Sequence, residues 1–99
     1  ILEHEPELKV VGRNCGITYS DLGATHHSLE DFAIVRMIHE VTIKSPQDPY
    51  EIEEAVKAML SINGPVYMRI GNPKIPVLFE KEPFVIGKGR KITKARHLR

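Results

Sequence analysis

Hydrophobic and polar positions change their period several times along this chain, and the changes predict short strands separated by helices. Residues 8–11, 41–44 and 66–70 are short runs rich in β-branched residues and set off by turn-forming residues, as strands are. Between them, apolar residues recur every three or four positions, the spacing of a helix that packs one face on a sheet. This order predicts an α/β fold with a short parallel sheet (strand-helix-strand-helix-strand) and helices packed on it.

The segment after the second predicted strand has the clearest helix signals. Asp48 is suited to cap a helix, Pro49 fits the first helical position, and Glu51 completes a capping box. The helix is expected to stop at Gly64 and Pro65. Its buried face is expected to comprise Ile52, Ala55, Val56, Met59 and Leu60.

A shorter helix is predicted after residue 25. Ser28 is the expected N-cap, with Asp31 three residues later, and the helix is expected to end near Ile38. Residues 12–25, which come before it, contain three glycines and no sustained period, so they predict one long ordered loop. The apolar stripe of this helix is expected to comprise Leu29, Phe32, Ala33, Val35 and Met37.

Length and composition limit the chain to one globular domain. With 99 residues, 41% hydrophobic and 27% charged, it has no apolar run near the roughly 20 residues that a membrane span requires. The first residues resemble no signal peptide and lack an initiating Met, so we expect a fragment or a trimmed chain. Cys15 is the only cysteine, which favours a reducing compartment, and a cytoplasmic location is expected.

The net charge of +1 conceals an uneven distribution. Residues 1–86 carry 8 basic and 13 acidic side chains, whereas residues 87–99 carry 6 basic and no acidic ones. A basic tail can bind nucleic acid, but this one has no aromatic residue for base stacking and no binding motif. A solvated terminus is the favoured interpretation, and nucleic-acid binding is the weaker alternative.

Two places in the sequence could carry chemistry. His26 and His27 lie between Gly23 and the predicted helix start, where imidazoles could act as acid and base or be ordinary polar loop residues. Arg69 ends the last strand, where its guanidinium could bind a phosphate or carboxylate, or simply pair with an acidic residue. Because ligands on parallel sheets bind at the carboxyl ends of strands, the loop after Val11 and the end of the last strand should open on the same edge.

Other kinds of site are less well supported. The histidines lack the spacing of a zinc site, so no metal site is predicted. Cys15 has no obvious neighbouring base and is more readily explained as an inert thiol than as a nucleophile. The chain has no glycine motif of the kind that cradles phosphates.

Three blocks together resemble the pyrimidine-binding domain of the transketolase family. They are residues 23–31 (GATHHSLED), 43–49 (IKSPQDP) and 64–71 (GPVYMRIG), in the family's order and spacing. The resemblance covers only the C-terminal half of that domain. It divides the chain into a partial pyrimidine-binding domain of three layers, residues 1–72, and an irregular strap with a basic tail, residues 73–99, that begins a linker.

The resemblance implies part of a thiamine-diphosphate enzyme that transfers a two-carbon ketol unit between sugar phosphates. It assigns to His26 a catalytic role beside the cofactor's reactive carbon, and to Arg69 the binding of the substrate phosphate. His27 and Asp21 are further candidates for substrate binding; Leu22 stands where many transketolases have an acidic residue, and Asp21 lies beside it. Sugar specificity is left open.

The family's catalytic glutamate and its site for diphosphate and Mg²⁺ are absent from these blocks. We therefore expect no tight cofactor binding and no catalysis by this chain alone, and we expect the remaining domains or another subunit as partner, in a homo- or hetero-oligomer. The alternative is a degenerate or split-gene domain that serves only as an assembly module, because an exposed parallel sheet edge invites pairing.

Overall fold

Three parallel strands form a single sheet in the order β1-β3-β2. The computed structural model describes residues 7–71, 74, 76–78 and 80–89. The strands are β1 (Lys9–Gly12), β2 (Thr42–Lys44) and β3 (Val66–Arg69), and β3 lies between the other two. The predicted parallel sheet and the strand-helix-strand-helix-strand order along the chain are confirmed.

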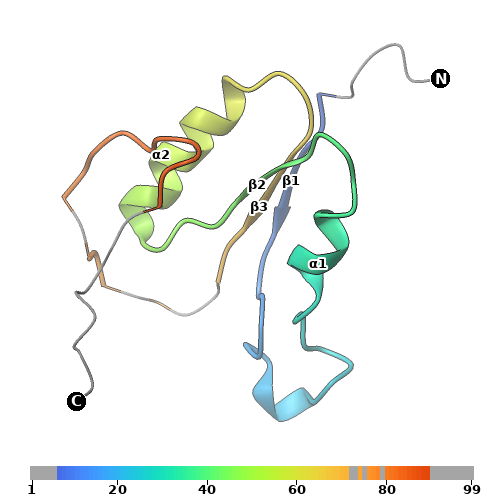
Figure 1. Ribbon diagram of the computed structural model, residues 1–99. Coiled ribbons are helices and arrows are strands. Elements are labelled where there is room, and N and C mark those ends of the chain that lie inside the picture. Colours follow the sequence, from blue (N-terminus) through green and yellow to red (C-terminus); the bar gives the residue numbers. More distant parts are fainter. Residues whose placement is uncertain (1–6, 72–73, 75, 79, 90–99) are drawn as a thin grey trace, which may run out of the picture.

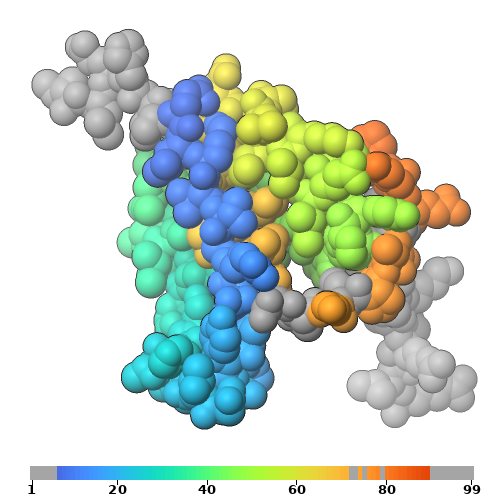
Figure 2. Space-filling view, turned by 180° about the vertical axis from the view of Figure 1, so that it is seen from behind, coloured from blue at the N-terminus to red at the C-terminus, as the bar shows by residue number. Residues whose placement is uncertain are grey.

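Two helices cover opposite faces of this sheet. Helix α1 (Asp31–Val35) lies on one face and helix α2 (Pro49–Leu60) on the other, so the sheet forms the middle of three layers (Figures 1 and 2). A 3-10 helix, η1 (Ser20–Leu22), interrupts the loop between β1 and α1. In the part of the chain described, no helix is long and apolar enough to span a membrane.

The hydrophobic core lies between the sheet and α2. Val66 and Met68 of β3 are each 1% exposed and form one cluster with Ala55 and Met59 of α2. The partly buried Phe84, beyond the last strand, packs against this cluster. Because side chains alternate between the two faces of a strand, Tyr67 and Arg69 of β3 point to the opposite face of the sheet from Val66 and Met68, toward α1.

Helix α2 begins as the sequence predicts. The Asp48 carboxylate, which is completely buried, accepts a hydrogen bond from the Glu51 backbone N–H at 2.9 Å, and Pro49 occupies the first turn. The Glu51 side chain accepts from the backbone N–H of Gln47 at 2.7 Å, one residue before the position that a capping box predicts. The second carboxylate oxygen of Asp48 accepts a hydrogen bond from the Leu78 backbone N–H at 2.8 Å. The same side chain therefore caps α2 and holds the strap.

The other end of α2 differs from the prediction. The helix ends at Leu60, before Gly64, and Leu60 is 72% exposed rather than part of the buried face. Successive residues turn by about 100° around a helix, so Leu60 lies about 120° from the middle of the stripe that Ala55 and Met59 define. It therefore points away from the sheet.

The prediction for α1 is wrong at both ends. Ser28 does not cap it: the helix begins at Asp31, because both backbone groups of Ser28 are hydrogen-bonded to Gly16, at 2.9 and 3.0 Å. The helix ends at Val35, and tighter turns continue the chain to Ile38. Three residues of its predicted apolar stripe are exposed: Leu29, Ala33 and Met37.

The described part of residues 74–89 has no regular secondary structure and runs beside α2 (Figure 1). Lys81 donates a hydrogen bond to Glu53 of α2 at 2.8 Å. Hydrogen bonds from Lys81 and then Lys57 lower the pKa of the Glu53 carboxyl to about 2. The strap thus contacts α2 through polar groups as well as through the core; residues 90–99 of the basic tail lie outside the described residues.

Replacing Asp48 with alanine should destabilise the fold by about 2 to 3 kcal/mol. The substitution removes a helix cap and leaves the Leu78 backbone N–H without its acceptor. Urea unfolding followed by circular dichroism measures the effect, with the exposed Asp21→Ala as the matched control. Equal stabilities of the two variants would contradict this role.

Candidate functional site

The candidate site lies at the edge of the sheet where β1 and β3 end. Gly12, the last residue of β1, pairs with Arg69, the last residue of β3. The loop that follows Gly12 therefore leaves the sheet beside Arg69 and forms the lobe at the bottom of Figure 1. The prediction that these two segments open on the same edge is confirmed.

His26 is exposed on this loop and has few internal contacts. Its backbone N–H donates to the Gly23 carbonyl at 3.0 Å, in a turn for which Gly23 adopts a φ of 73°. Its Nδ1 lies 3.0 Å from the Thr25 hydroxyl, and the Tyr19 ring approaches it edge-on, with centroids 6.3 Å apart. Among the described residues nothing hydrogen-bonds its Nε2, which can therefore meet a ligand.

His27 and Asp21 are placed differently. His27 is half-buried, and its Nε2 is buried without a hydrogen-bond partner among the described residues. Asp21 lies in η1 and is exposed. No hydrogen bond or ion pair between described residues joins either of them, or His26, to Arg69.

Arg69 has an internal partner. Its Nε lies 3.3 Å from Asp31 Oδ2, and its guanidinium carbon lies 4.5 Å from the centre of the Phe32 ring. The Tyr67 hydroxyl donates to the same Asp31 oxygen at 3.0 Å. Two residues of β3 thus hold the start of α1, and the acidic partner that the sequence left open for Arg69 is Asp31.

Arg69 also lies beside the loop that carries the histidines. The Gly16–Ser28 bridge ties the two arms of this loop together, and a Cβ on Gly16 would lie 3.9 Å from Nη2 of Arg69. Ser28 follows His27 directly in the chain. The position of the histidine pair is therefore restrained by a bridge that itself lies against Arg69.

Four buried polar atoms in this region have no hydrogen-bond partner in the described part of the chain. They are Asn14 Oδ1, His27 Nε2, Asp31 Oδ1 and Arg69 Nε, whose approach to Asp31 is too poorly aligned for a hydrogen bond. Buried polar groups in proteins are nearly always hydrogen-bonded. These atoms lie on the loop after β1, at the start of α1 and at the end of β3, so the unsatisfied polar groups are concentrated in the region of the candidate site.

Sequence reasoning missed Asp31 and Tyr67 as parts of this site. The run 66–69 alternates apolar and polar residues, and this alternation places Tyr67 and Arg69 on one face of β3. Gly12 was also overlooked: a Cβ there would overlap the Tyr67 hydroxyl. A larger residue at position 12 would force the Tyr67 ring to shift. No local pattern shows this contact, because the two residues are far apart in the sequence.

The described residues hold no group of three or more His, Cys, Asp or Glu side chains that could bind a metal ion. Cys15 is half-buried with a free thiol.

Comparison with known proteins identifies the fold and the site region together. Residues 3–76 match the model of the transketolase pyrimidine-binding domain. The chain belongs to this family. The matched residues include the three strands and both α-helices. They also include the four candidate site residues, which are Asp21, His26, His27 and Arg69.

Two curated relatives are named as a subunit and as a section of transketolases. The chain is 37% identical over 83 residues to one of the subunits of an apulose-4-phosphate transketolase from Phocaeicola vulgatus, covering 82% of this chain and 27% of that protein. It is 34% identical over 86 residues to a putative transketolase C-terminal section of Methanocaldococcus jannaschii, covering 84% and 27%. The chain thus spans about a quarter of the length of these relatives.

A solved structure has the same fold. It is described as a split-gene transketolase, an inactive β4 tetramer, and matches with a TM-score of 0.76 and 27% sequence identity. The match covers 91% of this chain and 28% of that one. The predicted resemblance to the transketolase pyrimidine-binding domain is confirmed.

The Tyr67–Asp31 contact should make the stability of this domain depend on pH in the alkaline range. Burial, and then the hydrogen bond to Asp31, raise the pKa of Tyr67 above its usual value of 10. Because the pKa of Tyr67 is higher in the folded state than in the unfolded state, the stabilisation that its neutral hydroxyl contributes is complete below about pH 10. This stabilisation is lost as the pH rises through the folded-state pKa of Tyr67.

Tyr67→Phe should therefore cost about 1 kcal/mol near pH 8 and flatten the decline in unfolding free energy above about pH 10. Tyr50→Phe, at a tyrosine that is 40% exposed, is the matched control. Urea unfolding at a series of pH values measures both. Parallel declines for the two variants would show that Tyr67 has no such linkage.

Proposed function

We propose that this chain supplies the substrate-facing part of a transketolase-type active site, which transfers a two-carbon ketol unit between sugar phosphates. Family membership supports the reaction class. The observation that carries the proposal is the carboxyl end of β1 and β3, where the Gly16–Ser28 bridge of the loop that carries His26 lies against the Arg69 guanidinium. An accessible imidazole and a guanidinium near the carboxyl ends of parallel strands suit a small polyhydroxylated anion.

In this proposal His26 is the catalytic residue. Its Nδ1 is held by Thr25, which leaves Nε2 to hydrogen-bond substrate hydroxyls and to take up or return a proton there. His27 and Asp21 are proposed as further substrate-binding groups, with Asp21 at the exposed end of the loop.

Arg69 is proposed to bind the substrate phosphate through its terminal amino groups. Asp31 holds its Nε edge and Phe32 supports its face, so the side chain is oriented before the substrate arrives. No described residue accepts a hydrogen bond from those terminal groups, which are the donors that a guanidinium offers to a phosphate. The negative charge of Asp31 repels a phosphate, so phosphate binding depends on the fixed orientation of the Arg69 guanidinium.

The cofactor implied for the proposed enzyme is thiamine diphosphate with Mg²⁺, which when bound would supply the nucleophilic carbon for transfer of the two-carbon unit. The described residues have no metal-binding group, so we propose that other domains or another subunit hold the diphosphate and the metal. Catalysis then requires this chain to assemble with a partner, and the chain alone is inactive. Cytoplasmic location belongs to the same proposal.

The proposal is tested by reconstitution with a chain that carries the remaining transketolase domains. Calorimetry should show thiamine diphosphate and Mg²⁺ binding to the assembly and not to this chain alone. In that assembly His26→Ala should lower kcat/KM for ketol transfer by about 10²- to 10³-fold. Lys57→Ala, at an exposed lysine of α2 outside the candidate site, is the control and should leave kcat/KM unchanged. Full activity of His26→Ala would contradict the role of His26.

The role of Arg69 is tested separately, since its loss also weakens the contact with α1. Arg69→Gln should raise KM for a sugar phosphate by about ten- to a hundredfold and leave KM for the unphosphorylated sugar nearly unchanged. Arg36→Gln, at an exposed arginine that follows α1, is the control. An equal loss on both substrates would show that Arg69 only holds the fold.

A second candidate function is assembly without catalysis. β1 is an edge strand of the described sheet, and its Val10 and Val11 are 41% and 45% exposed. Next to it lies an apolar groove of about 640 Å³ between β1, β3 and the segment after α1, lined by residues such as Leu8 and Ile38. This edge and groove suit pairing with another transketolase-type chain.

Light scattering coupled to size-exclusion chromatography should show the 99-residue chain as an oligomer. Val10→Lys should convert it toward the monomer, because a charge on an edge strand disfavours pairing. Lys57→Gln, on the exposed side of α2, is the control. A monomer at all concentrations would contradict assembly through this edge, and activity of the reconstituted enzyme would reject an assembly role alone.

A further inference from the structure

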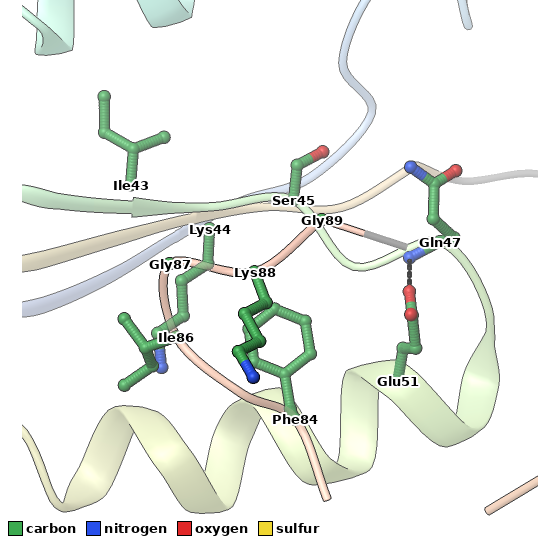
Figure 3. A pocket seen from close by; sticks show the side chains of 10 residues that line it. All are labelled: Ile43, Lys44, Ser45, Gln47, Glu51, Phe84, Ile86, Gly87, Lys88 and Gly89. Atoms are coloured by element: carbon green, nitrogen blue, oxygen red, sulfur yellow. Dashed lines mark hydrogen bonds between the residues drawn. The ribbon is translucent and has the colours of Figure 1, made fainter. Parts of the chain in front are cut away.

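A second cavity lies on the α2 side of the sheet, at the carboxyl end of β2. Residues 43–47, the start of α2 and residues 84–89 of the strap enclose about 340 Å³ (Figure 3). Two lysines line it, Lys44 from β2 and Lys88 from the strap. The candidate site described above lies on the α1 side, so this cavity is separate from it.

Lys44 is a buried cation without a counter-ion among the described residues. The residue is 3% exposed, and its ammonium group donates one long hydrogen bond, 3.4 Å, to the Ala55 carbonyl. The ammonium also lies 5.6 Å from the centre of the Phe84 ring. No carboxylate in the described ranges approaches it within ion-pair distance, although an ammonium group can donate three hydrogen bonds.

The local charges make this arrangement costly. Burial, and then the positive charge of Lys9, lower the pKa of Lys44. A buried charge normally requires a partner of opposite sign, because its desolvation is not otherwise compensated. Lys88 adds a second positive charge to the same cavity.

The one acidic residue that lines the cavity in the described part of the chain does not face Lys44. The Glu51 carboxylate accepts the hydrogen bond from the backbone N–H of Gln47 at 2.7 Å. Figure 3 shows this carboxylate turned toward Gln47, at the N-terminal end of α2. The side chains of residues 87–99 include no Asp or Glu. Among the described residues Lys44 therefore has no counter-charge, and an anion bound in the cavity would supply one.

We propose that this cavity is a binding site for a small free oxyanion of the phosphate or carboxylate class, held between Lys44 and Lys88. The carboxyl ends of parallel strands are where such sheets bind ligands, and Lys44 ends β2. The site stands independently of the proposed catalytic function, because none of the residues assigned to that function lines it.

The test measures binding of inorganic phosphate and of acetate to the 99-residue chain at constant ionic strength. Thermal unfolding should show a saturable rise in Tm with at least one of the two anions, and ³¹P NMR should report the bound phosphate directly. Lys88→Gln should weaken the binding several-fold, and Lys44→Met should abolish it. Lys57→Met, at an exposed lysine of α2, should bind as the unmodified chain does.

Lys44→Met conserves the volume of the side chain and removes the buried charge, so it should be at least as stable as the parent chain when no anion is present. Should it fail to fold, Lys88→Glu tests the same site from the strap and should abolish binding. An equal Tm rise in all variants would mean a general salt effect and overturn the proposal. Absence of binding by the unmodified chain would overturn it too, and would leave a partner's carboxylate as the counter-charge of Lys44.

Discussion

The structure depends on the chemical difference between the two faces of β3. On one face Val66 and Met68 form the apolar core with α2, and on the other Tyr67 and Arg69 hold α1 through a single carboxylate, Asp31. The hydrophobic face supplies most of the stability, because area removed from water is the dominant favourable contribution to folding. The polar face determines the position of α1, because a hydrogen bond and an ion pair fix where this helix begins.

The candidate site follows from that polar face. Asp31 fixes the end of the long loop, and the Gly16–Ser28 bridge fixes its middle, so His26 is presented on a restrained segment. Such restraint lets a loop position reactive groups while it keeps them accessible. The same geometry leaves buried polar atoms unsatisfied, which costs stability in the chain by itself. In the proposed function, binding of the substrate would offset part of this cost.

The strap has a comparable role on the other side of the sheet. Asp48 caps α2 and accepts the hydrogen bond from Leu78, and Phe84 reaches the core, so a segment without regular structure is held by a few specific contacts. These contacts also close the cavity around Lys44. A buried lysine is tolerated there because a backbone carbonyl and an aromatic face partly replace the water that it loses.

The sequence by itself determined the three strands, the parallel sheet, the start of α2 and the family, because each depends on local periodicity, capping or an ordered series of motifs. It also predicted that the loop after β1 and the end of β3 open on the same edge of the sheet, as the pairing of Gly12 with Arg69 shows. Only the tertiary structure decided that Ser28 pairs with Gly16 instead of capping a helix, that Asp31 is the partner of Arg69, and that Lys44 is buried without a counter-ion among the described residues. These contacts join residues well separated along the chain, and pairings across such distances are set by how the layers pack, which no local pattern of residues specifies.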